Sequence, residues 1–181
     1  MDSKLQIISG QYRGRRLNLP TGARPTQNRA RIALFNILQS LGIVPHNVWD
    51  AFAGSGAFGI ECMSRFPDAR VVFTDVAPIT VRKNLALVGA DARGKVVVAD
   101  AVTVAEKYGA VCDLIFLDPP YADGMLGDSI MRRITPVAKS GTIVVWEQEN
   151  GTEHTFDPTA WEVLRDRIYG RARFLILQRV Q

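Results

Sequence analysis

Short apolar runs alternate with amphipathic segments along most of the chain. An apolar run of about 4–8 residues between turn residues is typical of a buried strand, whereas apolar positions three or four apart indicate a helix. Such runs predict strands at residues 48–52, 70–75, 95–100, 111–117 and 142–146. The segments between them predict helices at residues 57–65, 79–88, 102–108 and 125–137. This repeated order predicts a parallel sheet with helices on both faces.

The two ends of the chain follow different patterns. Residues 4–19 alternate around Gly10 and Gly14, which predicts a β-hairpin, and Asn28 is placed to cap a helix at residues 29–41. Residues 163–169 and 173–179, separated by Gly170, predict two antiparallel strands that close one edge of the sheet. The expected fold is therefore α/β, with seven mostly parallel strands. We expect residues 1–41 to form an N-terminal hairpin and helix extension and residues 42–181 to form the main domain.

The composition is that of a globular protein. Of 181 residues, 47% are hydrophobic and 22% are charged, which is ordinary for soluble domains. No apolar run approaches the roughly 20 residues that span a bilayer, and the N-terminus lacks a secretory pattern, so we expect a cytoplasmic protein with no membrane partner. Cys62 and Cys112 lack metal-type spacing, and His46 and His154 stand alone. We therefore expect no metal site and two reduced thiols, with a disulfide as the alternative.

Positive charge is concentrated in the first 31 residues. The whole chain carries +4, but seven basic residues stand against Asp2 alone in this segment, a balance of +6, so the rest of the chain carries −2. Clustered arginines are typical of proteins that bind nucleic-acid phosphates; the alternative is a solvated basic face without a partner. The expected contacts are Arg13, Arg15, Arg16, Arg24, Arg29 and Arg31, although Arg24 and Arg31 could instead brace this segment against acidic groups.

A glycine-rich turn joins the predicted strand at residues 48–52 to its helix. Gly54, Gly56 and Gly59 match the G-x-G-x-x-G pattern, which lets a ligand approach the backbone at a helix N-terminus. Asp50 places a negative charge just before the turn. That charge suits a cationic ligand, so we expect S-adenosylmethionine, which carries an ammonium and a sulfonium, rather than NAD. The expected contacts here are Asp50, Phe52, Ala53, Gly54, Ser55 and Gly56.

Four aspartates stand at or near the ends of successive predicted strands: Asp50, Asp75, Asp100 and Asp118. Asp75 lies 19 residues past Gly56, which is the spacing of an acid that accepts ribose hydroxyl groups. Asp100, followed by Ala101, is placed to accept from an adenine amino group. Each aspartate also has an alternative role as a loop-opening or helix-capping residue. Because parallel strands present their carboxyl ends at one edge, we expect all four to lie along one crevice.

Asp118, Pro119, Pro120 and Tyr121 follow the apolar strand at residues 111–117. The two prolines remove backbone N–H donors and stiffen the turn, so nearby carbonyl groups stay free to accept hydrogen bonds. Tyr121 offers a flat face on which a base can stack. An acceptor carboxylate, a free carbonyl and an aromatic face suit a planar substrate with an exocyclic amino group, and hence methyl transfer to nitrogen. The alternative is a turn that only ends the strand.

Several of these motifs together resemble one family. The matching segments are residues 7–17, the Arg24-Pro25-Thr26 signature, residues 29–38, residues 50–65, residues 118–121 and residues 169–170. Over nearly its whole length the chain is similar to the RsmD family, bacterial methyltransferases that modify a guanine N2 in small-subunit ribosomal RNA. The glycine turn and the tetrad occur in many methyltransferases, whereas the hairpin and the Arg-Pro-Thr signature are more specific.

The resemblance implies the rest of the prediction. It implies a Rossmann-like class I methyltransferase fold, S-adenosylmethionine as cofactor, and 16S ribosomal RNA within the small subunit as substrate. It also implies that Asp118 and the Pro119 carbonyl accept from the guanine amino group while Tyr121 stacks on the base. We expect a monomer. Ile32 and Phe73 depart from the family pattern, which usually has acidic residues there, so Asp75 is left as the nearby acid for the ribose.

Three other functions share some of these features. A DNA adenine-N6 methyltransferase has the same tetrad, but this chain has no room for a sizeable target-recognition domain. In protein-glutamine methyltransferases the tetrad usually opens with Asn, and here it opens with Asp118. A non-catalytic RNA-binding assembly factor with this fold is disfavoured by the intact glycine turn and tetrad.

Overall fold

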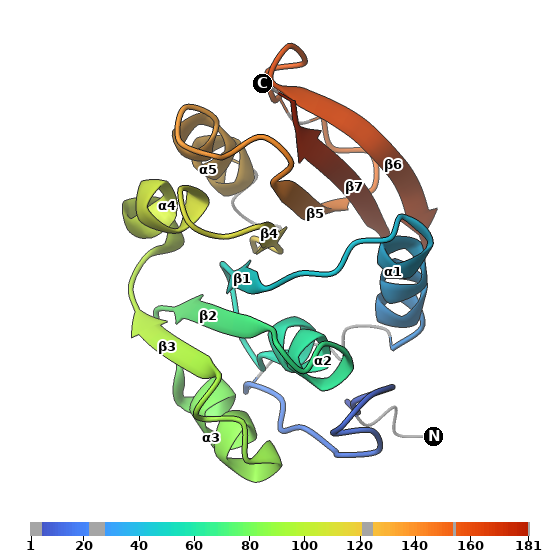
Figure 1. Ribbon diagram of the computed structural model, residues 1–181, viewed down its shortest axis with the longest axis vertical. Coiled ribbons are helices and arrows are strands. Elements are labelled where there is room, and N and C mark those ends of the chain that lie inside the picture. Colours follow the sequence, from blue (N-terminus) through green and yellow to red (C-terminus); the bar gives the residue numbers. More distant parts are fainter. Residues whose placement is uncertain (1–4, 22–27, 121–124, 154, 181) are drawn as a thin grey trace.

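The computed structural model describes residues 5–21, 28–120, 125–153 and 155–180 (Figure 1). In these residues the helices are α1 (Asn28–Ser40), α2 (Ala57–Arg65), α3 (Ile79–Val88), α4 (Ala101–Gly109) and α5 (Leu126–Ile134). The strands are β1 (Asn47–Asp50), β2 (Arg70–Asp75), β3 (Gly94–Val98), β4 (Leu114–Leu117), β5 (Ile143–Glu149), β6 (Trp161–Tyr169) and β7 (Ala172–Arg179). No helix among these residues is long and apolar enough to cross a membrane.

The strands form one seven-stranded sheet in the order β3-β2-β1-β4-β5-β7-β6. Neighbouring strands from β3 to β5 are parallel, and β7 is antiparallel to both β5 and β6. The predicted parallel sheet with an antiparallel C-terminal edge is thus confirmed. The chain runs outward from β1 through β2 to β3 and then returns to β4 on the other side of β1. The carboxyl ends of β1 and β4 therefore meet at a switch point, where open α/β sheets bind ligands.

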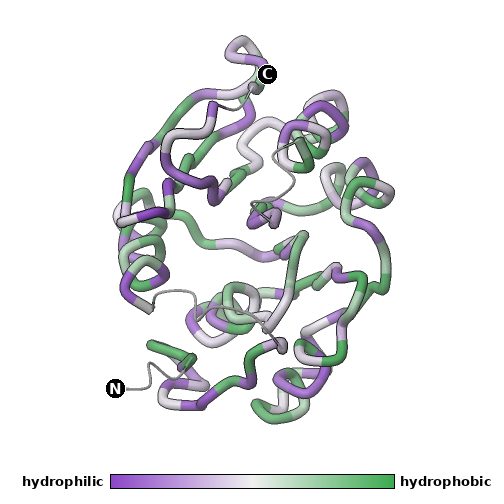
Figure 2. Tube along the Cα trace, turned by 180° about the vertical axis from the view of Figure 1, so that it is seen from behind, coloured by the Kyte–Doolittle hydropathy of each residue, from purple (hydrophilic) through white to green (hydrophobic). Residues whose placement is uncertain are grey.

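Helices cover both faces of the sheet (Figure 1). Strand residues alternate between two apolar cores: Val48 and Phe116 pack with residues of α1, α2 and α3, whereas Trp49 and Ile115 pack with residues of α4 and α5. Figure 2 shows hydrophobic and hydrophilic residues alternating along the outer helices, as expected when each helix buries one side. Burial of these apolar faces holds the strand ends, and the polar groups that follow them, in fixed positions.

The N-terminal segment turns back on itself as predicted for a hairpin, but only a small part of it pairs as β-strands. The backbone folds back on itself, with the Leu17 N–H donating to the Leu5 carbonyl at 2.9 Å, but the only bridge between residues 5 and 21 is Gln6 with Arg16. The reason is that other donors of this segment bind α2. The Ile8 and Ser9 N–H groups donate to the Glu61 carboxylate at 2.8 and 3.0 Å. The segment is therefore held by the helix rather than by a second strand.

Residues on both sides of position 41 share one core. Leu5, Ile7 and Phe35 belong to the same buried cluster as Phe58 and Phe116 of the main sheet and α2. The Phe35 and Phe58 rings stack with centroids 5.3 Å apart. The N-terminal extension is thus packed into the molecule by apolar contacts as well as by hydrogen bonds.

Several predicted boundaries differ from the structure. β1 ends at Asp50 rather than at residue 52, and β3 ends at Val98, so Asp100 lies on the turn after the strand. α5 ends at Ile134 rather than at residue 137. β5 continues to Glu149 because β7 pairs with its polar end, where Glu147 lies opposite Phe174. Cys62 and Cys112 are free and buried, and they belong to two different apolar cores.

Candidate active site

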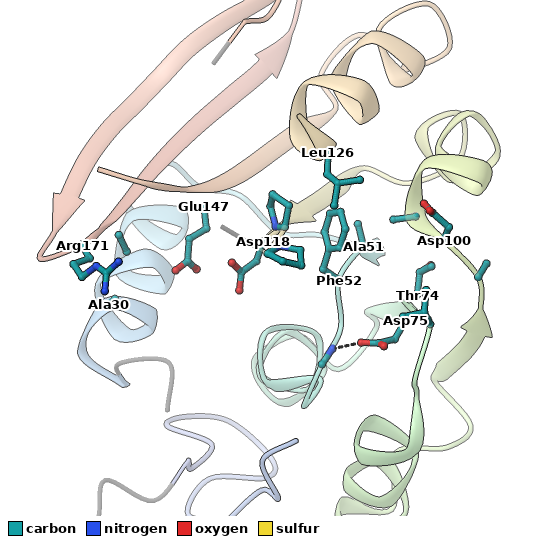
Figure 3. A pocket seen from close by; sticks show the side chains of 17 residues that line it. Ala30, Ala51, Phe52, Thr74, Asp75, Asp100, Asp118, Leu126, Glu147 and Arg171 are labelled. Carbon is teal, nitrogen blue, oxygen red and sulfur yellow. Dashed lines mark hydrogen bonds between the residues drawn. The ribbon is translucent and has the colours of Figure 1, made fainter. Parts of the chain in front are cut away.

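A cavity of about 730 Å³ opens at the carboxyl ends of the central strands. Figure 3 shows Asp75 and Asp100 at one end, Asp118 in the middle, and Glu147 and Arg171 at the other end. A second cavity of about 190 Å³ adjoins it, since Phe52, Gly54, Asp118 and Glu147 line both. Asp118 therefore lies between the two ends of the larger cavity (Figure 3) and also lines the smaller one.

The glycine turn reaches this cavity through Gly54, which lines it. Gly54 and Gly56 have φ values of 53° and 76°, which L side chains rarely adopt. A Cβ atom on Gly59 would lie 2.4 Å from the Phe73 ring, so the glycine lets α2 pack directly against β2. The Gly54 N–H donates to the Asp75 carboxylate at 2.7 Å, which ties the turn to the end of β2. Phe73 thus fills the space beside the turn, which explains the apolar residue at this position.

Asp50 is the last residue of β1 and only 2% exposed. Its carboxylate accepts from the Gly59 N–H at 3.1 Å. Burial raises the pKa of Asp50 to about 7; the Gly59 hydrogen bond opposes this rise, and the nearby Asp118 and Asp75 carboxylates add to it. A cation bound beside Asp50 would lower this pKa.

Asp118 follows β4 and lines both cavities. Burial raises its pKa to about 7 as well. Because Asp50 and Asp118 repel each other when both are ionised, they titrate as an interacting pair. Both acids line the smaller cavity, and together they favour a positively charged ligand or a substrate that donates hydrogen bonds.

Asp75 and Asp100 combine structural roles with a place in the cavity. Asp75 accepts from Gly54 and from the Ala77 N–H, the latter at 2.7 Å. Asp100 caps α4 by accepting from the Val102 N–H at 2.7 Å. Each carboxylate has room for further hydrogen bonds, so the capping role and a ligand-binding role are compatible at both residues.

The structure places the other predicted site residues as follows. Phe52, Ala101, Pro119 and Pro120 line the larger cavity, and Ala53 and Ser55 line the smaller one. Gly56 lines neither cavity; it is the N-cap residue of α2. Tyr121 and Arg24 lie outside the described residues.

The predicted RNA-binding arginines fall into two groups. Arg13, Arg15, Arg16 and Arg29 are exposed, as a phosphate contact requires. Arg31 is 4% exposed, donates to the Gln6 carbonyl and lies 3.9 Å from the Glu61 carboxylate. Burial lowers its pKa, an effect that Glu61 partly opposes. This placement favours the alternative for Arg31, a brace that holds the N-terminal segment to α2.

Glu147 and Arg171 were not predicted as site residues. Glu147 is 6% exposed on β5, and Arg171 lies in the turn between β6 and β7. The only sequence signal for Glu147 is an acidic residue directly after the apolar run at residues 143–146. No group of three or more His, Cys, Asp or Glu side chains in the described part of the chain is arranged to hold a metal ion.

Comparisons with known proteins agree with this geometry. A family model described as conserved hypothetical protein 95 matches residues 5–178. Ribosomal RNA small subunit methyltransferase D of Escherichia coli (strain K12) is 33% identical over 183 residues, which cover 97% of this chain and 90% of that protein.

Two solved structures are similar in fold. The structure of yhhF from Escherichia coli superposes with a TM-score of 0.81 and 30% identity, over 98% of this chain and 99% of that one. An RNA methyltransferase from Salinibacter ruber, solved with S-adenosyl-L-homocysteine, has a TM-score of 0.66 over 87% of this chain and 95% of its own, and its 16% identity shows the fold alone. The chain therefore has the Rossmann-like class I methyltransferase fold and belongs to the family described as conserved hypothetical protein 95, the RsmD family that its motifs resemble.

Proposed function

We propose that the protein transfers the methyl group of S-adenosylmethionine to the exocyclic N2 of a guanine in 16S ribosomal RNA. The observation that carries the proposal is the position of Asp118 between the two ends of the cavity (Figure 3). A methyl donor at the Asp75–Asp100 end and a base at the Glu147 end would both reach this carboxylate. The name of the Escherichia coli relative, a small-subunit ribosomal RNA methyltransferase, supports the RNA substrate.

The cofactor fits the residues at the β1–β3 end. The Asp50 carboxylate offers negative charge to the ammonium and sulfonium groups, and the Asp75 carboxylate remains able to accept from ribose hydroxyls. Asp100 and Ala101 line the same end of the cavity, and in this proposal they would contact the adenine. When bound, S-adenosylmethionine supplies an electrophilic methyl group.

The target nitrogen needs orientation and charge stabilisation more than a strong base. The guanine amino lone pair is delocalised into the ring, so the nitrogen is a weak nucleophile. The Asp118 carboxylate and the Pro119 carbonyl would accept its two hydrogens and stabilise positive charge that develops on nitrogen. Holding the nitrogen in line with the methyl carbon turns an encounter into an oriented reaction. The proton leaves after transfer, when the amine has become acidic.

The base must leave its helix to reach this position, because a stacked base cannot approach a buried methyl donor. Tyr121 would stack on the extruded base; this is an expectation from the sequence. In this proposal residues 1–41 serve as the RNA-binding extension and residues 42–181 as the catalytic domain. The protein acts as a cytoplasmic monomer on the assembled small subunit.

The test is transfer of a labelled methyl group to small ribosomal subunits that lack the modification. Free ribosomal RNA and duplex DNA serve as competing substrates, and Asp118→Asn serves as the impaired enzyme. We expect N2-methylguanine in the subunits, with kcat reduced on the order of 10²–10³-fold in Asp118→Asn. The dissociation constant for S-adenosylmethionine should change much less. Label on DNA, label at another atom, or equal losses of turnover and cofactor affinity would contradict the proposal.

A further inference from the structure

We propose that Glu147 reads the target base, accepting a hydrogen bond from the N1–H of the guanine whose amino group Asp118 holds. This selects guanine over adenine. The inference rests on the proposed function, because it names the residue that would make that function specific for guanine. Neither the glycine turn nor the tetrad explains the choice of base, since both suit any exocyclic amino group.

The sheet register brings Glu147 beside Asp118. Leu117, the last residue of β4, pairs with Trp146 of β5, so the next residues along the two parallel strands are Asp118 and Glu147. Residues in register on neighbouring parallel strands project to the same face of a sheet. Figure 3 shows both carboxylates directed to the same side of the cavity, and both line the two adjoining cavities.

The sheet also holds Glu147 firmly. β5 lies between β4 and β7, and Glu147 itself pairs with Phe174 of β7. The residue is only 6% exposed. Once a base covers it, a carboxylate this buried discriminates strongly between a hydrogen-bond donor and an acceptor presented to it, since water cannot then replace the missing partner.

Guanine has the edge that two adjacent carboxylates require. Its N1–H and its N2 amino group are neighbouring donors, so Glu147 and Asp118 can each accept one. Adenine presents a donor at N6 beside an acceptor at N1, and that N1 lone pair would face the Glu147 carboxylate. A site built to hydrogen-bond a substrate group rejects analogues that lack it, by up to about 10⁴–10⁵-fold in favourable cases.

The analogue 2-aminopurine isolates this contact. It keeps the amino group at C2, but its N1 carries no hydrogen and accepts hydrogen bonds. Small subunits would be reconstituted with 16S RNA that carries either guanine or 2-aminopurine at the modified position. The measurement is kcat/KM for methylation of each base by wild type, by Glu147→Gln, and by Glu162→Gln. Glu162 is an exposed residue of β6 that lines neither cavity, so this variant is a matched control.

We expect wild type and Glu162→Gln to prefer guanine over 2-aminopurine by about 10²-fold or more. In Glu147→Gln the preference should fall by at least about tenfold, because the glutamine amide can donate to the N1 of 2-aminopurine. 2-Aminopurine also lacks the O6 of guanine, but this loss affects every enzyme alike. Its effect therefore cancels when the base preferences of the enzymes are compared. Binding of S-adenosylmethionine by Glu147→Gln should match wild type and reports an intact fold.

Three outcomes would overturn the inference. An unchanged preference in Glu147→Gln with uniformly lower activity would assign Glu147 a structural role only. Equal use of both bases by wild type would refute it without any variant, even if Glu147→Gln fails to fold. A wild-type enzyme that does not methylate guanine at N2 would refute the proposed function itself, and this is read from wild type and guanine alone.

Discussion

Asp50 and Asp118 both line the smaller cavity, and the repulsion between their ionised carboxylates has a consequence for ligand binding. Both have a pKa raised from 3.8 to about 7, mainly by burial. In the unfolded chain these groups ionise near pH 4, so between about pH 4 and pH 7 the folded state binds more protons. Stability of the unliganded protein therefore falls as the pH rises through this window. A bound cation would restore part of this lost stability, because it stabilises the ionised carboxylates.

We expect the affinity for S-adenosylmethionine to rise with pH up to slightly above 7. The carboxylate forms bind the cationic cofactor, so binding below pH 7 must release protons. The slope should approach about tenfold in affinity per pH unit for each proton released. Calorimetric titrations from about pH 5.5 to about pH 8.5, repeated in buffers of different ionisation enthalpy, measure both quantities.

Asp118→Asn provides the check on this coupling. It removes a negative charge near Asp50, so the pKa of Asp50 should fall and the midpoint of the affinity curve should move to lower pH. Asp91→Asn, a change at an exposed residue, should leave the curve in place. An affinity that is flat across the range in wild type would show that the two acids are ionised before the cofactor binds.

Among the elements, α2 joins the N-terminal segment to the site. Glu61 is fully buried, and its carboxylate accepts from Ile8, from Ser9 and, at 2.8 Å, from the Arg65 guanidinium. One turn later, Ser64 accepts from the Tyr12 N–H at 2.8 Å. The same helix begins at the glycine turn, so displacement of the N-terminal segment from α2 would disturb the element that supports the cofactor end of the cavity.

Gly10→Ala should destabilise the protein more than Gly14→Ala. The two glycines have φ values of 81° and 83°, so an alanine at either position costs about 1–2 kcal/mol of backbone strain. A Cβ atom on Gly10 would lie 1.8 Å from the Ser64 carbonyl oxygen, whereas the nearest atom to one on Gly14 is 3.9 Å away. Only Gly10→Ala must therefore push the segment away from α2.

Urea unfolding of the two variants measures the difference. We expect Gly14→Ala to lose about 1–2 kcal/mol and Gly10→Ala to lose more than that, with added loss of methylation of the small subunit. Equal losses in both variants would mean that the segment shifts freely on α2 and that the contact with Ser64 contributes little.

Local patterns predicted most elements well, and two of the differences share one cause. Helices α2 and α3 match their predicted bounds because a glycine turn and Pro78 mark where they begin. The polar end of β5 was missed because only its antiparallel pairing with β7 makes it a strand. Strand pairing in the N-terminal segment is likewise limited, because the Ile8 and Ser9 N–H groups donate to Glu61 of α2. Where the partner is distant in sequence, periodicity carries no signal.

At the scale of the whole molecule, topology explains what could be predicted of the site. The expectation that four aspartates share one crevice follows from parallel strands alone. Asp75, Asp100 and Asp118 line the larger cavity, whereas Asp50 lines only the smaller cavity beside it. Glu147 lies on β5, which pairs with β4, and Arg171 lies in the turn before β7, which pairs with β5. Their position at the cavity depends on this tertiary pairing. The burial of Arg31 could not be predicted either, because the sequence of a basic segment does not show which carboxylate one of its arginines will approach.

The charge distribution of the molecule predicts how it binds RNA. The first 31 residues carry a balance of +6 and the remainder −2, and Arg13, Arg15 and Arg16 are exposed on the N-terminal segment. Replacing all three with alanine should weaken binding to the small subunit and flatten its salt dependence. Each lost phosphate contact should reduce the slope of log K against log salt by about 0.7–0.9.

The control replaces the exposed Arg132, Arg133 and Lys139 with alanine, which removes the same charge from α5 and the segment after it. If attraction depends on net charge alone, both triple variants lose affinity equally. If the N-terminal segment contacts phosphates directly, only the first variant changes the salt slope, while its affinity for S-adenosylmethionine stays as in wild type. We expect the second result, because counterion release depends on the phosphates contacted and not on the total charge of the protein.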